Sequence, residues 1–550
     1  MRITPLLAAV LAIAAGCRPL YRAPANPTYD VILRNGRVVD GTGNPWYYGD
    51  VAIIGDRIAH VGPARSLSDA RAHRVIDATG LVVAPGFIDM LGHSEYAILR
   101  NPGAISKITQ GITSEITGEV SSAWPNTVPG ERRPDSGVDS WDSLEGYFSF
   151  LEEAGTAINL GTYVAAASVR RAVMGDASRS PTPDELAQMG ELVERAMRDG
   201  AMGFSTGLIY PPTTFFSTEE LTILARRAAA NGGGYASHIR SEGENLLDAI
   251  REAIHIGTAA DTWVEIRHLK ASGPANWPKM AQAIALIDSA RSSGVDITAD
   301  MYPYPASGTG LDAILPTWVQ AGGTDSMLIR LADPAVRARL AEERAANDRS
   351  RPADAILINS VASDSLEMYE GVRLDEVGRM RGQDPYEAAY DILLADSGET
   401  SAIYFSMSEE NVRLGLAQPW VSIGQDAGAR TPDTTGRGRG HPRGFGTFPR
   451  ILGRYVREDS VLTLEDAIRR MTSLPAQRVG LDQRGVLKEG QYADIVVFDP
   501  ATVIDRATFE QPQQISTGMH HVFVNGTAVV DGGYATGSLP GRALLGPATQ

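Results

Sequence analysis

The chain has 550 residues, of which 43% are hydrophobic and 21% are charged, a composition typical of a folded globular protein and not of a disordered one. Its 50 basic and 66 acidic residues give a formal net charge of −16, which argues against a nucleic-acid partner because phosphate binding needs clustered Lys and Arg. The single cysteine excludes an intrachain disulfide and any zinc site built from several thiolates.

The N-terminal segment, residues 1–16, is predicted to be an export signal. Arg2 supplies an early positive charge, a short apolar run follows, and small residues precede Cys17. The segment Ala14–Cys17 resembles a bacterial lipobox, in which the cysteine bears the lipid, although alanine stands where leucine is usual. We therefore expect an exported protein of the cell envelope, either a periplasm-facing lipoprotein or a protein secreted after an ordinary signal. Residues 17–28 are predicted to be a linker.

Strand-like sequence occurs near both ends of the remaining chain. Residues 31–41 place apolar runs on either side of an Asn-Gly turn, and residues 522–532 repeat nearly the same phrase. We expect residues 29–84 and 481–547 to form one small, discontinuous β-sandwich domain, with a long segment inserted between its two parts.

The middle segment, residues 85–480, alternates short apolar runs with stretches that have apolar residues at helical spacing. Eight strand–helix repeats indicate an α/β fold in which a closed parallel (β/α)8 barrel of the TIM type is formed. An open doubly wound sheet is disfavoured because no Gly-rich phosphate loop follows the first strand. The predicted strands are Val82–Asp89, Ile112–Thr117, Gly161–Ala167, Met202–Thr206, Tyr235–His238, Val264–His268, Ile297–Tyr302 and Trp420–Gln425.

The connection between the seventh and eighth predicted strands is more than a hundred residues long, which is too long for a simple loop. We expect an inserted subdomain over about residues 316–400, beside the mouth of the barrel. A role for it as a lid is a hypothesis.

Polar residues at the carboxyl ends of the strands are the candidates for chemistry, because barrel enzymes carry their sites at that face. His238 and His268 lie 30 residues apart, about one strand–helix unit, so their rings are expected to converge from neighbouring strands. Two imidazoles and one carboxylate form a plausible zinc site with an open position for water, although buried histidines are often only structural. Asp426 ends the last strand, where it either accepts a proton from such a water or caps a helix.

Six longer phrases occur in order between Tyr29 and Leu545: Pro85–Asp89, Gly200–Leu208, Tyr235–Arg240, His268–Lys270, Asp300–Tyr304 and His441–Arg450. In these phrases the chain resembles the amidohydrolase superfamily and, within it, the D-aminoacylase (N-acyl-D-amino-acid deacylase) group. The resemblance implies that His238 and His268 bind zinc and that Asp426 is the general base. It also implies that a cation, a phenol and a guanidinium hold the substrate carboxylate, and the residues in these positions are Lys270, Tyr304 and Arg443.

Two positions depart from that pattern. The superfamily usually reads Asp-x-His-x-His after the first strand, whereas here Leu91 replaces the first histidine, and His93 is either a metal ligand or a bystander. After the second strand the group supplies a metal-binding cysteine, for which Glu119 is the nearest substitute, either as a ligand or as a partner that orients a histidine. Residues 202–210 contain no lysine, so we do not expect the lysine-bridged metal pair of hydantoinase-like relatives. We expect one catalytic zinc ion instead.

The resemblance therefore implies a zinc hydrolase that converts small N-acyl-D-amino acids to a carboxylate and a free D-amino acid, and residues 1–16 predict that it is exported. A dipeptidase acting on dipeptides with a C-terminal D-residue would use the same chemistry. A barrel that has lost its activity is a third alternative, because Leu91 replaces a histidine and the group's metal-binding cysteine is missing. The presence of His238, His268, Lys270 and Asp426 favours an active enzyme. Contact with a membrane is expected only through the lipid anchor.

Overall fold

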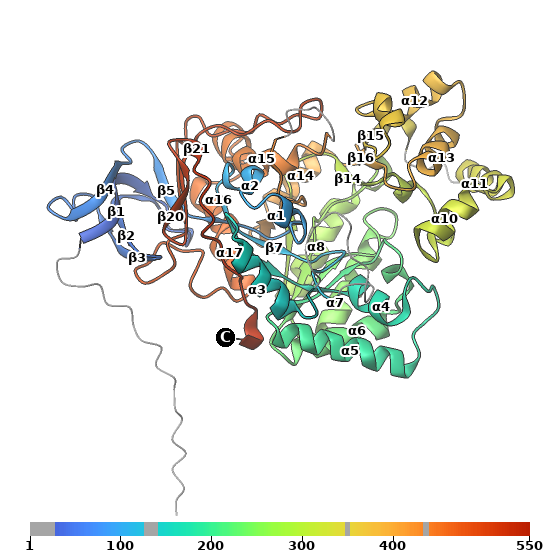
Figure 1. The fold of residues 1–550 in the computed structure, drawn as a ribbon, viewed down its shortest axis with the longest axis horizontal. Helices are drawn as coiled ribbons and strands as arrows, with labels where there is room; N and C mark the ends of the chain where they lie inside the picture. The colour runs from blue at the N-terminus through green and yellow to red at the C-terminus, as the bar shows by residue number, and fades with distance from the viewer. Residues whose placement is uncertain (1–27, 126–140, 347–351, 433–438, 550) are drawn as a thin grey trace, which may run out of the picture.

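The computed structural model describes residues 28–125, 141–346, 352–432 and 439–549. The predicted export signal, residues 1–16, and residues 17–27 of the predicted linker lie outside this part of the chain. Figure 1 shows a central barrel with a small β domain on one side and a mostly helical insert on the other. No helix in the described part of the chain is long and apolar enough to cross a bilayer.

Both chain ends contribute to one nine-stranded sheet in the small β domain, coloured blue and dark red in Figure 1. Alternate residues of its first strand are buried on opposite faces, Leu33 in one apolar cluster and Ile32 in another, as the two-residue period of a strand requires. The halves join where β5 pairs antiparallel with β18. The strands are β1 (Thr28–Val38), β2 (Tyr47–Ile54), β3 (Arg57–Pro63), β4 (Arg71–Asp77), β5 (Val82–Pro85), β18 (Ile495–Phe498), β19 (Met519–Val524), β20 (Thr527–Asp531) and β21 (Tyr534–Ala535).

The barrel contains parallel strands at eight positions within the described residues, the third of them interrupted at Tyr163. The amide of Met90 donates to the carbonyl of Ile423 at 3.3 Å, which closes the ring between its first and last strands. The strands are β6 (Phe87–Asp89), β7 (Ile112–Thr117), β8 (Asn159–Thr162) with β9 (Val164–Ala165), β10 (Gly203–Gly207), β11 (Gly234–His238), β12 (Val264–Ile266), β13 (Ile297–Met301) and β17 (Val421–Ile423). The fold is therefore the predicted barrel with an added β domain.

The first predicted strand, Val82–Asp89, is two strands in two different sheets. β5 pairs with β18 in the β domain and β6 pairs with β7 in the barrel, because the chain changes sheet at Gly86. A side chain at Gly86 would collide with Thr113, so only glycine permits this close crossing.

Amphipathic helices cover the outside of the barrel, as the green helices of Figure 1 show. α5 begins with a capping box between Thr182 and Glu185 and buries Met189, Val193 and Met197. The helices of the barrel domain are α1 (Ala97–Arg100), α2 (Ile105–Ile108), α3 (Leu144–Ala154), α4 (Ala166–Met174), α5 (Pro183–Arg198), α6 (Thr218–Ala229), α7 (Leu246–Ala260), α8 (Lys279–Ser292), α14 (Glu409–Leu416), α15 (Arg443–Arg450), α16 (Leu464–Met471) and α17 (Ser473–Arg478).

The insert has its own antiparallel sheet, β14 (Ser307–Gly310), β16 (Ser401–Tyr404) and β15 (Ile356–Ser360), and its own apolar core. Because β14 and β16 pair with each other, the insert spans residues 307–404 and is wider than the predicted 316–400. Its helices are α9 (Thr317–Gln320), α10 (Gly323–Leu331), α11 (Pro334–Ala346), α12 (Leu374–Arg381) and α13 (Pro385–Ala395).

Candidate active site

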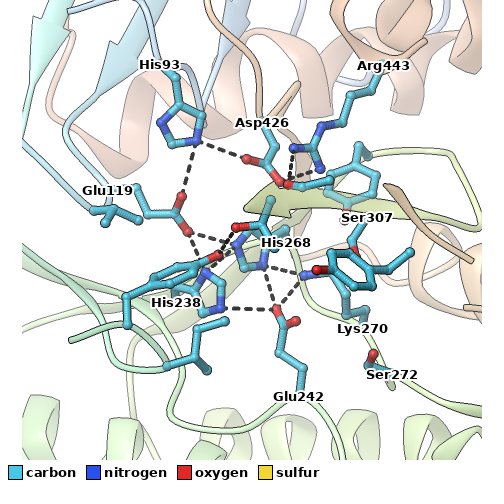
Figure 2. A pocket seen from close by; sticks show the side chains of 17 residues that line it. His93, Glu119, His238, Glu242, His268, Lys270, Ser272, Ser307, Asp426 and Arg443 are labelled. Carbon is cyan, nitrogen blue, oxygen red and sulfur yellow. Dashed lines mark hydrogen bonds and ion pairs between the residues drawn. The ribbon is translucent and has the colours of Figure 1, made fainter. Parts of the chain in front are cut away.

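The carboxyl ends of the barrel strands open into a cavity of about 270 Å³ (Figure 2). Four of its residues come from strand ends or the loops just after them: Glu119 after β7, His238 at the end of β11, His268 after β12 and Asp426 after β17. This is the face at which barrel enzymes carry their active sites.

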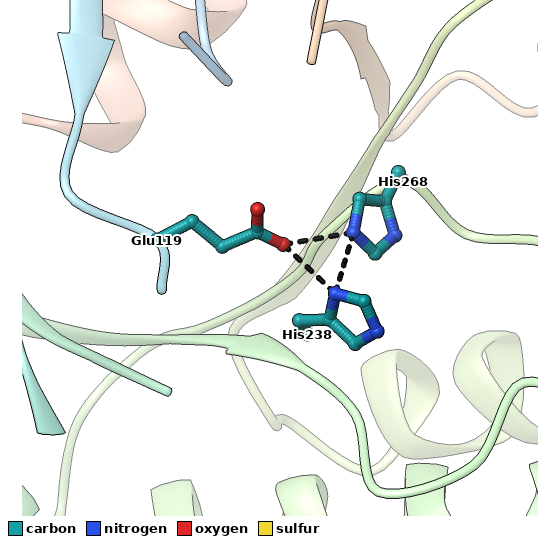
Figure 3. Close-up of side chains that lie close together, drawn as sticks. All are labelled: Glu119, His238 and His268. Carbon is teal, nitrogen blue, oxygen red and sulfur yellow. Dashed lines mark hydrogen bonds and ion pairs between the residues drawn. The ribbon is translucent and has the colours of Figure 1, made fainter. Parts of the chain in front are cut away.

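Three buried ligand-type side chains converge at the centre of this cavity (Figure 3). Oε1 of Glu119 lies 3.1 Å from Nδ1 of His238 and 2.8 Å from Nε2 of His268, and the two ring nitrogens are 2.9 Å apart. Two imidazole nitrogens and a carboxylate oxygen are a donor set that zinc takes in catalytic sites. The other nitrogen of His238, Nε2, is buried without a hydrogen-bond partner. The residues therefore fit a zinc ion, with Glu119 as the oxygen donor.

Glu242, which the sequence analysis did not select, lies on the outer side of the two histidines. Its Oε1 is 2.9 Å from Nδ1 of His268 and 3.8 Å from Nε2 of His238, and it also accepts a hydrogen bond from the ammonium of Lys270. Burial alone would raise the pKa of Glu242, but Lys270 and the two histidines hold it well below its usual range. The signal in the sequence was a carboxylate four residues after His238, in the loop that follows the same strand.

A second group of ligand-type residues shares Glu119 with the first. Nε2 of His93 lies 3.3 Å from Oε2 of Glu119 and 2.9 Å from Oδ1 of Asp426. His93 is therefore beside the central group and not in it. Because Glu119 faces one group with each oxygen, the number of bound ions stays a prediction.

Leu91 keeps a structural role at the position where the superfamily has a histidine. Its carbonyl accepts a hydrogen bond of 2.7 Å from the amide of Asp426. Asp426 has a φ of +54° and His268 a φ of +34°, a region that residues other than glycine rarely adopt. Such backbone strain clusters at functional sites, where the surrounding contacts maintain it.

Asp426 is paired with Arg443, whose Nη1 lies 2.6 Å from Oδ2 of the carboxylate. Burial alone would raise the pKa of Asp426, but the charge of Arg443 and a hydrogen bond from His93 lower it to about 2. The carboxylate is therefore ionised at neutral pH and can accept a proton.

Cationic and aromatic side chains form the wall beside Asp426. The guanidinium of Arg443 lies 4.7 Å, and Nζ of Lys270 5.6 Å, from the centroid of the Tyr302 ring. Within the described residues Tyr302 lines the cavity and Tyr304 does not, contrary to the prediction. The hydroxyl of Tyr304 instead donates to Asp505 at 3.2 Å. β13 ends at Met301 and the chain bends at Pro303, so Tyr302 and Tyr304 do not follow the alternation of a strand.

The insert supplies another part of the wall. Ser307, Gly308 and Thr309 of β14 line the cavity, and Arg443 donates to the carbonyl of Gly308 at 3.2 Å. The hydroxyls of Tyr210 and Thr309 are 3.0 Å apart, which links the barrel to the insert. The barrel and the insert therefore both contribute residues to the wall of the cavity.

The backbone around Asp426 is fixed by a buried charged cluster beneath the cavity. Oδ1 of Asp89 accepts from the amide of Gln425 at 2.8 Å, and Oδ2 pairs with Nζ of Lys107 at 2.9 Å. Lys107 also donates to the carbonyl of Ala427 at 2.7 Å, so both neighbours of Asp426 are held.

Comparisons with known proteins point to one family and one fold. A family model described as "Amidohydrolase family" matches residues 74–530. A D-aminoacylase of Alcaligenes xylosoxydans xylosoxydans is 37% identical over 94% of this chain and 97% of that protein, and an N-acyl-D-glutamate deacylase of the same organism is 37% identical over 91% and 93%. The crystal structure of N-acyl-D-glutamate deacylase from Bordetella bronchiseptica, complexed with zinc and a phosphonate inhibitor, superposes with a TM-score of 0.80 at 34% identity, covering 94% of this chain and all of that one.

Proposed function

This chain belongs to the amidohydrolase family, and we propose that it hydrolyses the amide bond of N-acyl-D-amino acids to a carboxylate and a free D-amino acid. The observation that carries the proposal is the convergence of Glu119, His238 and His268 beside an ionised Asp426 at the barrel mouth. Its identity to a D-aminoacylase and an N-acyl-D-glutamate deacylase over nearly the whole chain supports the substrate class.

A zinc ion held by Glu119, His238 and His268 would supply a Lewis acid that polarises the scissile carbonyl and acidifies a water molecule. Asp426 accepts the proton of the attacking water on a carboxylate oxygen and then delivers it to the nitrogen of the departing amine. Its low pKa ensures that the oxygen is free to accept this proton over the neutral range.

The substrate carboxylate lies near Tyr302 in this proposal, between the cations of Lys270 and Arg443. A guanidinium fork and an ammonium suit a carboxylate, and both side chains are buried enough for the pairing to be strong. The neutral phenol of Tyr302 adds a hydrogen-bond donor, because burial raises its pKa well above the usual range.

The decisive experiment measures zinc content and turnover of N-acetyl-D-leucine and N-acetyl-L-leucine by the purified protein. We expect about one or more zinc ions per chain, hydrolysis of the D enantiomer, and loss of turnover by about 10²-fold or more in Asp426→Asn. Purified protein that binds no stoichiometric metal, or unchanged turnover in Asp426→Asn, would refute the proposal.

We also propose that the protein is exported and anchored to the envelope by a lipid on Cys17. Support comes from the sequence of residues 1–17 alone, which lie outside the described residues. Mass spectrometry of the mature N-terminus tests it, and Cys17→Ser should move the protein from the membrane fraction to the aqueous one. A processed chain in which Cys17 carries no lipid would contradict the anchor and would indicate an ordinary secretory signal.

A further inference from the structure

A second chamber adjoins the catalytic cavity, with a volume of about 640 Å³. Its walls come from the loops after β11 and β12 of the barrel and from the insert, which contributes Asp312, Ala313 and Leu315. This volume falls in the range that holds a whole drug-sized ligand, so the chamber is larger than one amino-acid side chain requires.

The chamber opens from the end of the catalytic cavity that lies away from Arg443, next to Tyr210 and to Glu242, the partner of Lys270. Ring contacts mark this direction: Arg443 lies over Tyr302, whose ring centroid is 6.5 Å from that of His268. His238 follows at 4.3 Å from His268, and Tyr210 at 5.2 Å from His238. Tyr210 lines both cavities, whereas Arg443 and Tyr302 line only the catalytic one. Figure 2 likewise shows His238 and His268 between Arg443 and Glu242, and Glu242 also lines both.

This order fixes which part of a substrate reaches the chamber. With the amino-acid carboxylate at Arg443 and the scissile amide at the histidines, the acyl group extends past His238 toward Tyr210. In this orientation the acyl group enters the chamber, whose walls would select its size and chemistry.

The described walls offer acceptors rather than cations. Arg240 is the one basic residue among them, and its guanidinium is occupied by Glu252 and by the carbonyls of Thr214 and Phe216. Gln320 donates its amide hydrogens to the carbonyls of Leu315 and Asp312, which leaves its own oxygen as an acceptor.

Asp312 adds a carboxylate to this wall. Burial raises its pKa, and hydrogen bonds from the backbone amides of Asp312 and Ala313 act against this rise. A donor-rich or cationic group suits such walls, whereas a second carboxylate does not.

We infer that the acyl group is a peptidyl group of two or more residues with a free N-terminus, so that the substrates are short peptides ending in a D-residue. The chamber accommodates the peptidyl chain, its N–H groups meet the acceptors of the wall, and its N-terminal ammonium lies near Asp312. Water adds across the last peptide bond: hydroxyl joins the carbonyl carbon, the C–N bond breaks, and the amine nitrogen takes the proton. This inference rests on the proposed function and extends it to the acyl side of the substrate.

The test compares kcat/KM for acyl derivatives of one amino acid, D-leucine: N-acetyl, N-succinyl, N-octanoyl, Ala-Ala, and N-acetyl-Ala-Ala. We expect the Ala-Ala derivative to exceed the N-acetyl derivative by about tenfold or more, and the N-succinyl derivative to be the poorest. Ala313→Trp, which fills the chamber, should abolish the tripeptide preference. Ala345→Trp, an exposed change on α11, is the matched control and should keep it.

Asp312→Asn has nearly the same shape as the wild type and keeps the test valid if Ala313→Trp does not fold. It should lower the preference for Ala-Ala-D-leucine over N-acetyl-Ala-Ala-D-leucine, because the latter has no ammonium. A wild-type preference for N-octanoyl-D-leucine, or equal rates for N-acetyl and Ala-Ala derivatives, would overturn the inference while the proposed function stands. Absence of turnover of every D-leucine derivative would instead refute the proposed function itself.

Discussion

Glu242 and Glu119 flank His268 from opposite sides: Oε1 of Glu242 is 2.9 Å from Nδ1, and Oε1 of Glu119 is 2.8 Å from Nε2. A hydrogen bond from Nδ1–H to Glu242 leaves the lone pair on Nε2, which faces the metal-binding centre, and Nζ of Lys270 lies 2.6 Å from the same Nδ1. Lys270 balances the charge of Glu242 on its outer side. Glu242 is therefore a positioning residue for the ligand set.

We predict that Glu242→Gln weakens zinc binding by about 10- to 100-fold, because an amide holds the imidazole less firmly than a carboxylate. Competition with a chromophoric chelator measures the affinity directly and does not depend on turnover. Glu244→Gln, an exposed change two residues further along the same loop, should bind zinc like the wild type. Equal affinities of the two variants would contradict the assigned role.

The sequence predicted the elements with strong local signals and missed those set by packing. His238 and His268 were placed correctly because equal spacing along a strand–helix repeat puts residues at equivalent strand ends. Glu242 carried no such signal, since a loop carboxylate reaches the site only through the path of the folded loop. Tyr302 and Tyr304 could not be separated, because the choice depends on the bend at Pro303 and on Asp505, about 200 residues away.

The division of the first predicted strand, Val82–Asp89, into two strands was missed for a similar reason. Residues 82–89 form one apolar run, and periodicity alone does not show that Gly86 lets the chain pass from one sheet to another. The insert was predicted from the length of the connection, yet its limits depend on the pairing of β14 with β16, which is a tertiary contact.

The pairing of Arg443 with Asp426 predicts a pH effect. Against an upward effect of burial, the charge of Arg443, together with a hydrogen bond from His93, lowers the pKa of Asp426 to about 2. In Arg443→Met the pKa of Asp426 should rise, so the base becomes protonated at a higher pH and the acidic limb of the kcat profile moves upward. Arg443→Lys retains the charge and should shift the limb less. An acidic limb at the same pH in all three proteins would show that Asp426 does not set it.

The buried cluster beneath the site predicts a large effect on stability. Lys107, Asp89 and Glu115 are fully buried, and Lys107 bridges the two carboxylates at 2.9 and 3.3 Å. Lys107→Met should lower the free energy of unfolding by about 3–5 kcal/mol, because it leaves buried carboxylates without a partner. Arg339→Met breaks an exposed pair on α11 and should cost about 1 kcal/mol or less. Urea titration of both variants measures the difference.

Glu115 predicts a dependence of stability on pH. Burial raises its pKa to about 7, from a reference value of 4.5, although Lys107 acts in the opposite direction. The folded state thus holds this proton more tightly than the unfolded state, so the stabilisation is complete below about pH 4.5 and is lost as the pH rises through 7. Glu115→Gln cannot titrate and should flatten the fall in unfolding free energy between these pH values. An unchanged slope in urea titrations at several pH values would show that Glu115 does not contribute.

Glu119 predicts how the metal preference of the site is set. Its carboxylate supplies one oxygen beside the ring nitrogens of His238 and His268, a harder donor set than one containing a thiolate. Glu119→Cys in a Cys17→Ser background should keep metal binding and shift the preference toward softer ions such as Cd²⁺. Because Cys17 is the only cysteine of the natural chain, any thiolate-to-metal absorption band in this variant reports position 119 alone. Glu119→Ala in the same background, which removes the ligand, should lose most of its affinity and show no band. Metal-bound Glu119→Cys without such a band would mean that residue 119 is not a ligand.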